Sequence, residues 1–164
     1  MKVLLINGSP HEKGCTYTAL SEIAGVLNEN GIDTEIFQIG SDPIRGCVGC
    51  GGCAGKNRCV FQDQVNVALD KAAKADGFIF GSPVHYASAG GAITSFLDRM
   101  FFAGKENMVY KPGAAVVSCR RAGSTATLDQ LNKYFTISNM PIASSQYWNS
   151  IHGLAQGEAE MDEE

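Results

Sequence analysis

Short apolar runs alternate with amphipathic helical segments along the chain, and this alternation constrains the fold more than any other feature. The run over 3–6 is continuously apolar, as expected for a strand that is buried on both faces. Between residues 16 and 30, apolar positions recur every three or four residues, which predicts a helix that stops near Gly31. By the same criteria, further strands are predicted at 34–39, 77–81, 114–118 and 142–147, and further helices around 65–73 (capped by Asp63), 93–101 and 124–135.

Strands that alternate with crossover helices form parallel, doubly wound sheets. We therefore predict an α/β fold with a five-stranded parallel sheet in the flavodoxin-like arrangement, which binds its ligand outside the carboxyl ends of the strands. The 164 residues fit one domain over 1–164. After Tyr147 the chain runs into an acidic tail over 158–164 that is too short for the last covering helix of such a sheet. We expect either a truncated chain or a partner subunit that covers that face.

The composition excludes several classes of protein. A net charge of −4 with 18% charged residues lacks the basic surface of a nucleic-acid binder. The N-terminal apolar run is too short for a signal peptide, and no stretch approaches the roughly 18 apolar residues of a membrane span. We therefore expect a cytoplasmic protein with neither membrane nor nucleic acid as a partner. Six cysteines in such a chain point to metal or redox use rather than to disulfides.

Four of these cysteines, Cys47, Cys50, Cys53 and Cys59, follow the spacing C-x2-C-x2-C-x5-C in a glycine-rich segment, which we call the cysteine loop (residues 45–60). Iron–sulfur clusters are usually held by four cysteine thiolates, and glycine lets backbone N–H groups approach the cluster sulfurs. The spacing therefore favours a cluster and electron transfer. Zinc is the alternative, although structural zinc sites usually use two separated C-x2-C pairs, whereas Cys50 is shared here.

The segment over 8–16 joins the first strand to the first helix and is suited to bind a phosphate. A helix N-terminus offers unpaired N–H groups and the positive end of the helix dipole. Ser9 and Thr16 add hydroxyl donors, and His11 can donate to a phosphate. The segment has neither the Gly-Lys-[Ser/Thr] ending of a Walker A motif nor the G-x-G-x-x-G fingerprint of dinucleotide-binding folds. The alternative is a tight turn that needs glycine only for its geometry.

Five segments together resemble the NADPH-dependent FMN reductase family, which has a flavodoxin-like fold: 8–16, 82–86, 96–99, 118–123 and 145–149. The spacing of the four cysteines resembles that of the iron–sulfur flavoproteins, a branch that carries FMN and a [4Fe–4S] cluster. The resemblance spans nearly the whole chain, to about Gly153.

The resemblance implies a set of site residues. The FMN phosphate would be bound by Ser9, His11, Cys15 and Thr16; the flavin ring would be lined by Pro83, Val84, His85 and Tyr86; and its other side would be bordered by Ser118, Arg120, Arg121 and Gly123. Members of the family often carry arginine at the position of His11 and asparagine or serine at that of Cys15. The cluster would be held by the four cysteines of the cysteine loop. For Cys15 and Cys119 we also expect the role of small buried residues.

The resemblance further implies a flavin-dependent oxidoreductase that moves electrons between a donor, either ferredoxin-like or NAD(P)H, and an acceptor through FMN and a [4Fe–4S] cluster. Many FMN reductases keep similar cysteines without a cluster, so one alternative is an NAD(P)H-dependent FMN or quinone reductase with empty thiols. The alternative from another class is a non-enzymatic electron shuttle or a zinc-bearing interaction module. We find no nucleophile–base pair for catalysis, and the resemblance implies a homodimer or homotetramer.

Overall fold

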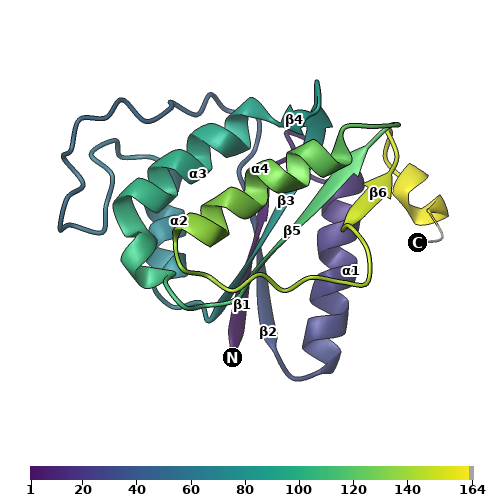
Figure 1. Ribbon diagram of the computed structural model, residues 1–164, viewed down its shortest axis with the longest axis horizontal. Helices are drawn as coiled ribbons and strands as arrows, with labels where there is room; N and C mark the ends of the chain where they lie inside the picture. Colours follow the sequence, from purple (N-terminus) through teal and green to yellow (C-terminus); the bar gives the residue numbers. More distant parts are fainter. Residues whose placement is uncertain (163–164) are drawn as a thin grey trace.

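The computed structural model describes residues 1–162 and forms a twisted parallel sheet flanked by helices (Figure 1). The strands are β1 (Lys2–Asn7), β2 (Asp33–Gln38), β3 (Gly77–His85), β4 (Ser88–Ala89), β5 (Gly113–Cys119) and β6 (Ser150–His152). The helices are α1 (Cys15–Glu29), α2 (Gln64–Ala72), α3 (Gly91–Gly104) and α4 (Ser124–Ile137), with short 3-10 turns η1 (Lys105–Asn107) and η2 (Glu158–Met161). The strand order is β2-β1-β3-β5-β6, all parallel, and β4 pairs antiparallel with the end of β3.

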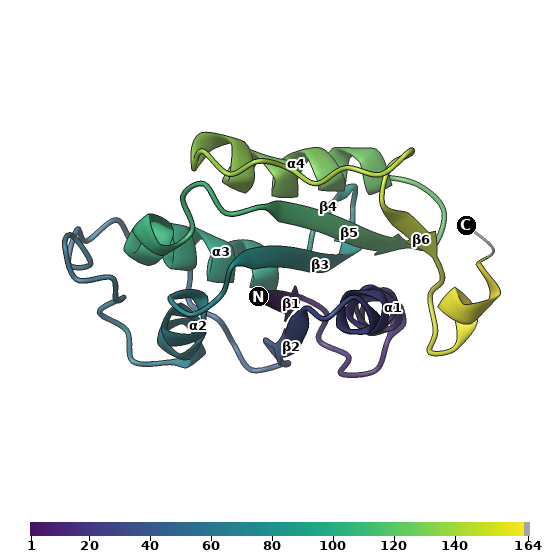
Figure 2. The same ribbon diagram turned by 90° about the horizontal axis from the view of Figure 1, so that it is seen from below.

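Helices cover both faces of the sheet, and each face has its own apolar cluster. Successive residues of β1 point alternately into the two clusters. Leu4 and Ile6 face the larger cluster, which contains buried residues of α2, α3 and α4. Val3 and Leu5 face the smaller one, which contains buried residues of α1. Figure 2 shows α1 and α4 on opposite sides of the sheet. The predicted α/β fold with a parallel, flavodoxin-like sheet is therefore confirmed.

The predicted position of the fifth strand, 142–147, is wrong. Ile142 forms a single isolated bridge with Gly113, whereas the strand that pairs with the end of β5 is β6, beginning at Ser150. Between them the backbone turns, because the Ser145 hydroxyl bonds both the Tyr147 carbonyl and the Asn149 side chain. The Asn149 amide donates to the Ala115 carbonyl at 3.1 Å, a group that faces this edge of β5. The apolar residues of this stretch were thus misinterpreted as strand residues.

The face of the sheet on the α1 side is partly open. Within residues 1–162, no α-helix follows α4, and the short turn η2 packs against α1. A groove of about 800 Å³ lies between α1, β5 and the segment over 145–151. Tyr147 and Trp148 border it with 70% and 58% of their surfaces exposed.

The segments in which a site is predicted lie at the carboxyl ends of the parallel strands or in the loops that follow them, at one edge of the sheet. β3 extends to His85, past its predicted end at Gly81, because it continues pairing with β5 and then with β4. Its residues over 83–85 therefore belong to a strand rather than to a free loop. No helix within residues 1–162 is both long and apolar enough to cross a bilayer.

Candidate functional site

Three buried hydroxyl groups lie at the carboxyl ends of β1 and β5. The Thr16 and Ser118 hydroxyls are 2.8 Å apart and join the start of α1 to β5. The backbone N–H of Ser9 donates to the Asn7 side chain at 3.1 Å, and the Ser9 hydroxyl accepts from the backbone N–H of His11 at 3.1 Å. The structure thus brings together four of the predicted residues, with the His11 side chain exposed.

The N-terminus of α1 is open to an anion. Gly14 is its N-cap, no side chain caps it, and its first turn holds no acidic residue. The first N–H groups of the helix and the positive end of its dipole are therefore free of side-chain competition. The Cys15 thiol points away from this position, since it donates to the Ala155 carbonyl at 3.2 Å and is buried under the C-terminal segment. At this site Cys15 offers its backbone rather than its sulfur.

The predicted flavin segment forms a tight hairpin between β3 and β4. Val84 pairs with Ala89, and His85 pairs with Ser88. The two turn residues, Tyr86 and Ala87, both have left-handed backbones, with φ values of 51° and 57°. Consecutive positive φ values are those of a type I′ turn, which here is formed without glycine. His85 and Tyr86 are exposed.

Helix α4 holds this hairpin in place through Gln130. Its side-chain carbonyl accepts hydrogen bonds from the backbone N–H of Ala89 at 2.8 Å and from the Ser88 hydroxyl at 2.9 Å. Sequence reasoning missed Gln130, and it also missed Asn7 and Gln38, which fix the backbone around Ser9. A polar residue at the end of an apolar strand was the available signal for Asn7, whereas nothing distinguishes Gln130 from a surface residue of α4.

The loop after β5 lies against the same hairpin. Pro83 of β3 is the register partner of Ser118, so two predicted sets of residues meet within the sheet. Gly123 has a φ of +91°, and a Cβ at its position would lie 2.8 Å from the Ala87 Cα. Arg120 and Arg121 are exposed.

The charge of Arg120 acts on the C-terminal segment through Glu158. The backbone N–H groups of Leu154 and Ala155 lower the pKa of Glu158, and the positive charge of Arg120 contributes in the same direction. Arg120 is thus near an acidic side chain of the described tail as well as near the carboxyl end of β5.

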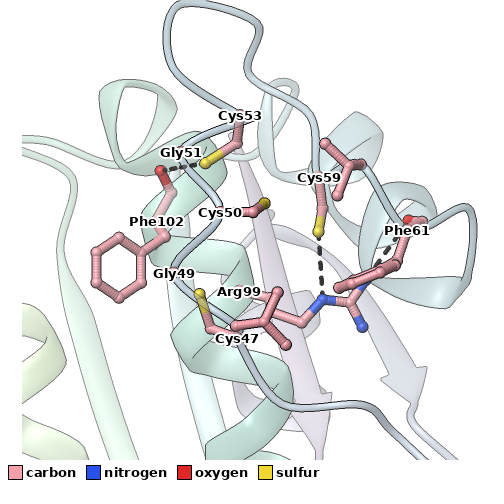
Figure 3. A pocket seen from close by; sticks show the side chains of 11 residues that line it. Cys47, Gly49, Cys50, Gly51, Cys53, Cys59, Phe61, Arg99 and Phe102 are labelled. Atoms are coloured by element: carbon pink, nitrogen blue, oxygen red, sulfur yellow. Dashed lines mark hydrogen bonds between the residues drawn. The ribbon is translucent and has the colours of Figure 1, made fainter.

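The four cysteines of the cysteine loop line one pocket of about 160 Å³ (Figure 3). Its other walls are largely apolar and include Val48, Val60, Phe61 and Phe102. Gly49, Gly51 and Gly55 have φ values of 65°, 67° and 68°, which suit glycine and shape the turns between the cysteines. All six cysteines are free thiols; Cys15 and Cys119 are buried, and burial raises the pKa of the Cys119 thiol.

The thiols surround this pocket without converging on a single point. Within residues 1–162, no group of three or more His, Cys, Asp or Glu side chains is arranged so that it could hold a metal ion. The Cys53 thiol donates to the Phe102 carbonyl at 3.5 Å, and the Cys59 sulfur accepts from the Arg99 guanidinium at 3.3 Å. Cys47 and Cys50 are exposed.

Arg99 of α3 lines the same pocket and is 1% exposed. It forms a two-pronged ion pair with Asp63, at 2.7 and 2.8 Å. Burial lowers the pKa of Arg99, but hydrogen bonds to Asp63 and Cys59 outweigh this effect and raise it, so the guanidinium stays charged. Asp63 also caps α2, as predicted, by accepting from the Val65 N–H.

Comparison with known proteins decides the family of the chain. The sequence model of the NADPH-dependent FMN reductases matches residues 1–154. The chain belongs to this family. As a member of the NADPH-dependent FMN reductase family, it is a flavin-dependent oxidoreductase.

Curated relatives of this FMN reductase family member include iron–sulfur flavoproteins. That of Methanocaldococcus jannaschii is 30% identical over 171 residues, covering 99% of this chain and 89% of the relative. That of Methanosarcina thermophila is 25% identical over 166 residues, covering 99% of this chain and 86% of the relative. Among solved structures, a flavodoxin from the domain Archaea matches with a TM-score of 0.66 at 14% identity, over 98% of this chain and 90% of that one. The last comparison supports the fold.

Proposed function

We propose that this flavin-dependent oxidoreductase passes electrons between an external donor and FMN through a [4Fe–4S] cluster held by Cys47, Cys50, Cys53 and Cys59. The observation that carries the proposal is the single pocket that these four side chains line. Two relatives that align with 99% of the chain are named iron–sulfur flavoproteins, which supports the same assignment.

The residues at the carboxyl ends of the strands fit FMN. The uncapped N-terminus of α1 and the buried hydroxyls of Ser9 and Thr16 suit a phosphate. We assign the FMN phosphate to Ser9, His11, Thr16 and the backbone of Cys15; one side of the ring to Pro83, Val84, His85 and Tyr86; and the other side to Ser118, Arg120, Arg121 and Gly123. When bound, FMN supplies hydride and single-electron chemistry, whereas the protein binds and orients it.

The cysteine loop fits an iron–sulfur cluster by its donor set. Four thiols supply the ligand type and number that such clusters require, and a cluster supplies one-electron transfer when it is bound. The left-handed glycines hold the chain in turns between the four cysteines, and the pocket that they line is otherwise largely apolar.

Anaerobic purification followed by an absorption spectrum and by iron, sulfide, zinc and flavin counts tests the proposal. We expect flavin bands, broad absorption near roughly 400 nm and about four irons per chain. Changing Cys50→Ser should remove the iron but keep the flavin, whereas Cys119→Ser, outside the cysteine loop, should keep both. Flavin without iron would refute the cluster, and the absence of both would refute the whole assignment.

A second candidate function is an NADPH-dependent FMN reductase whose cysteines bind nothing, and the family match favours it. The two candidates differ in the electron donor. Anaerobic stopped-flow mixing of the holoprotein with NADPH, and separately with a reduced ferredoxin, distinguishes them. Rapid flavin reduction by NADPH in an iron-free protein supports the second candidate, and reduction by ferredoxin through an iron-containing protein supports the first.

We also propose that the protein acts as a homodimer or homotetramer, since the groove beside α1 leaves Tyr147 and Trp148 largely exposed. Light scattering on the purified holoprotein measures the mass directly. A monomer at micromolar concentration would contradict this assembly.

A further inference from the structure

We propose that Arg99 is a positioning residue for the cysteine loop, and that its hydrogen bond to Cys59 raises the reduction potential of the group held there. The inference rests on the proposed function for its second half, because it assumes a cluster on the four cysteines. Its first half, the fixing of the loop, concerns the protein alone.

Every N–H donor of the Arg99 guanidinium has a partner, and those partners lie on both ends of the cysteine loop. Nη1 donates to the Arg45 carbonyl at 3.1 Å, before the first cysteine. Nε donates to the Cys59 sulfur at 3.3 Å, at the last cysteine. The remaining bonds go to the Phe61 carbonyl, at 3.5 Å, and to the two oxygens of Asp63. One buried side chain of α3 therefore joins the beginning and the end of the loop.

The ring of Phe61 strengthens this junction. The guanidinium carbons of Arg45 and Arg99 lie 4.7 and 5.2 Å from its centroid. A planar guanidinium held by a two-pronged carboxylate and an aromatic ring has a fixed orientation, which a lysine ammonium would not have. The contacts with Asp63 and the Phe61 ring therefore fix the direction of the Nε–H bond, which points to the Cys59 sulfur.

Cys59 differs from the other cysteines in what its sulfur meets. The described contacts give it a donor on a cation, whereas the Cys53 thiol faces a carbonyl oxygen. Hydrogen bonds and net charge around the sulfurs set the potentials of iron–sulfur clusters. A charge-assisted donor favours the more negative, reduced form and therefore raises the potential. Asp63 offsets part of the charge of Arg99. Removing the charge of Arg99 should therefore lower the reduction potential, and removing the charge of Asp63 should raise it.

Two variants test this prediction of opposite signs. Arg99→Gln removes the cation and should lower the cluster potential. Asp63→Ser keeps a good N-cap for α2 but removes the negative charge, and should raise the potential. Arg58→Gln is the matched control, since Arg58 lies in the same loop but pairs with the exposed Asp70. Arg99→Lys keeps the charge and should restore part of the potential lost in Arg99→Gln.

The potential is measured on the anaerobically purified holoprotein by a redox titration monitored by electron paramagnetic resonance. Shifts of the same sign in Arg99→Gln and Asp63→Ser would indicate general disruption and would overturn the electrostatic half. An unchanged potential in Arg99→Gln would overturn it as well.

Hydrogen exchange of the reduced, metal-free chain tests the positioning half independently of any cluster. Arg99→Gln and Arg99→Lys should both accelerate exchange of amides over 45–61 at least several-fold, while amides of α1 and the Arg58→Gln control remain as in the wild type. Equal protection in all chains would overturn the positioning role. If the wild type binds no iron, the proposed function fails, and this measurement still decides whether Arg99 fixes the loop.

Discussion

Gly123, in the loop after β5, packs against the hairpin between β3 and β4. Both segments are assigned to the flavin, and the methyl group that Gly123→Ala adds should push them apart. The φ of Gly123, +91°, is a conformation that costs other residues about 1–2 kcal/mol. An added Cβ would also lie 2.8 Å from the Ala87 Cα and 3.1 Å from the Val84 Cγ1. The first of these atoms is backbone in a tight hairpin and has little room to move, so overpacking adds about 1–3 kcal/mol. We expect Gly123→Ala to lose about 2–5 kcal/mol of unfolding free energy in total.

Two assays test this prediction. Urea unfolding measures the loss of stability, and a separate titration of the folded apoprotein with FMN, monitored by flavin fluorescence, measures the FMN affinity. Gly31→Ala is the matched control, because Gly31 has a φ of +75° and its added Cβ would meet nothing within 4 Å. That variant should lose only the conformational part, about 1–2 kcal/mol, and should bind FMN normally. Equal losses in the two variants, together with unchanged FMN affinity, would refute the coupling between the hairpin and the loop after β5.

Three further predictions concern the core, the hairpin and pH. The Phe135 ring is fully buried and stacks at 4.7 Å on a phenylalanine of β3, so Phe135→Ala should lose about 3–5 kcal/mol in urea unfolding. Gln130→Ala should accelerate hydrogen exchange over 84–89 and weaken FMN binding several-fold, because the hairpin loses its bonds to α4; unchanged exchange would contradict this role. Two lysines lower the pKa of Glu35 from its usual 4.5, so its contribution to stability is present above that pH and is lost as the pH falls further. Glu35→Gln should therefore lower the free energy of unfolding by less than about 1 kcal/mol at pH 7, because solvent screens these partly exposed ion pairs, and should not lower it at pH 2. An equal loss at the two pH values would refute the pairing.

Local sequence patterns predicted most of the fold because they reflect burial within one element. The continuous apolar run of β1 and the spacing within α1 correspond to real faces of the sheet and helix. Asp63 caps α2 as its position suggested. The fifth strand was misplaced because Ile142 and Tyr147, the apolar residues at the two ends of the predicted range, are exposed, so their hydrophobicity did not report burial in the sheet.

The sequence indicated which segments carry the candidate site, but it did not predict the contacts that hold these segments in place. The four cysteines are close in sequence, so their shared pocket follows from spacing. Arg99 meets residues that lie 36 to 54 positions away, and no local pattern encodes such contacts. Cys15 was assigned to the phosphate from the family resemblance, whereas its side chain turns toward Ala155, a residue 140 positions later.

Arg99 holds together the two ends of the long connection between β2 and α2, because it binds both the Arg45 carbonyl and Asp63. The chain leaves and re-enters the scaffold at one buried side chain, and the residues between these points lie mostly at the surface. Surface loops tolerate changes in length and composition far better than the elements that they connect. A segment attached in this way, such as the one that we propose to hold a cluster, can be gained, altered or lost in evolution while the sheet folds unchanged. The composition of the cysteine loop and the stability of the sheet are thus free to evolve separately.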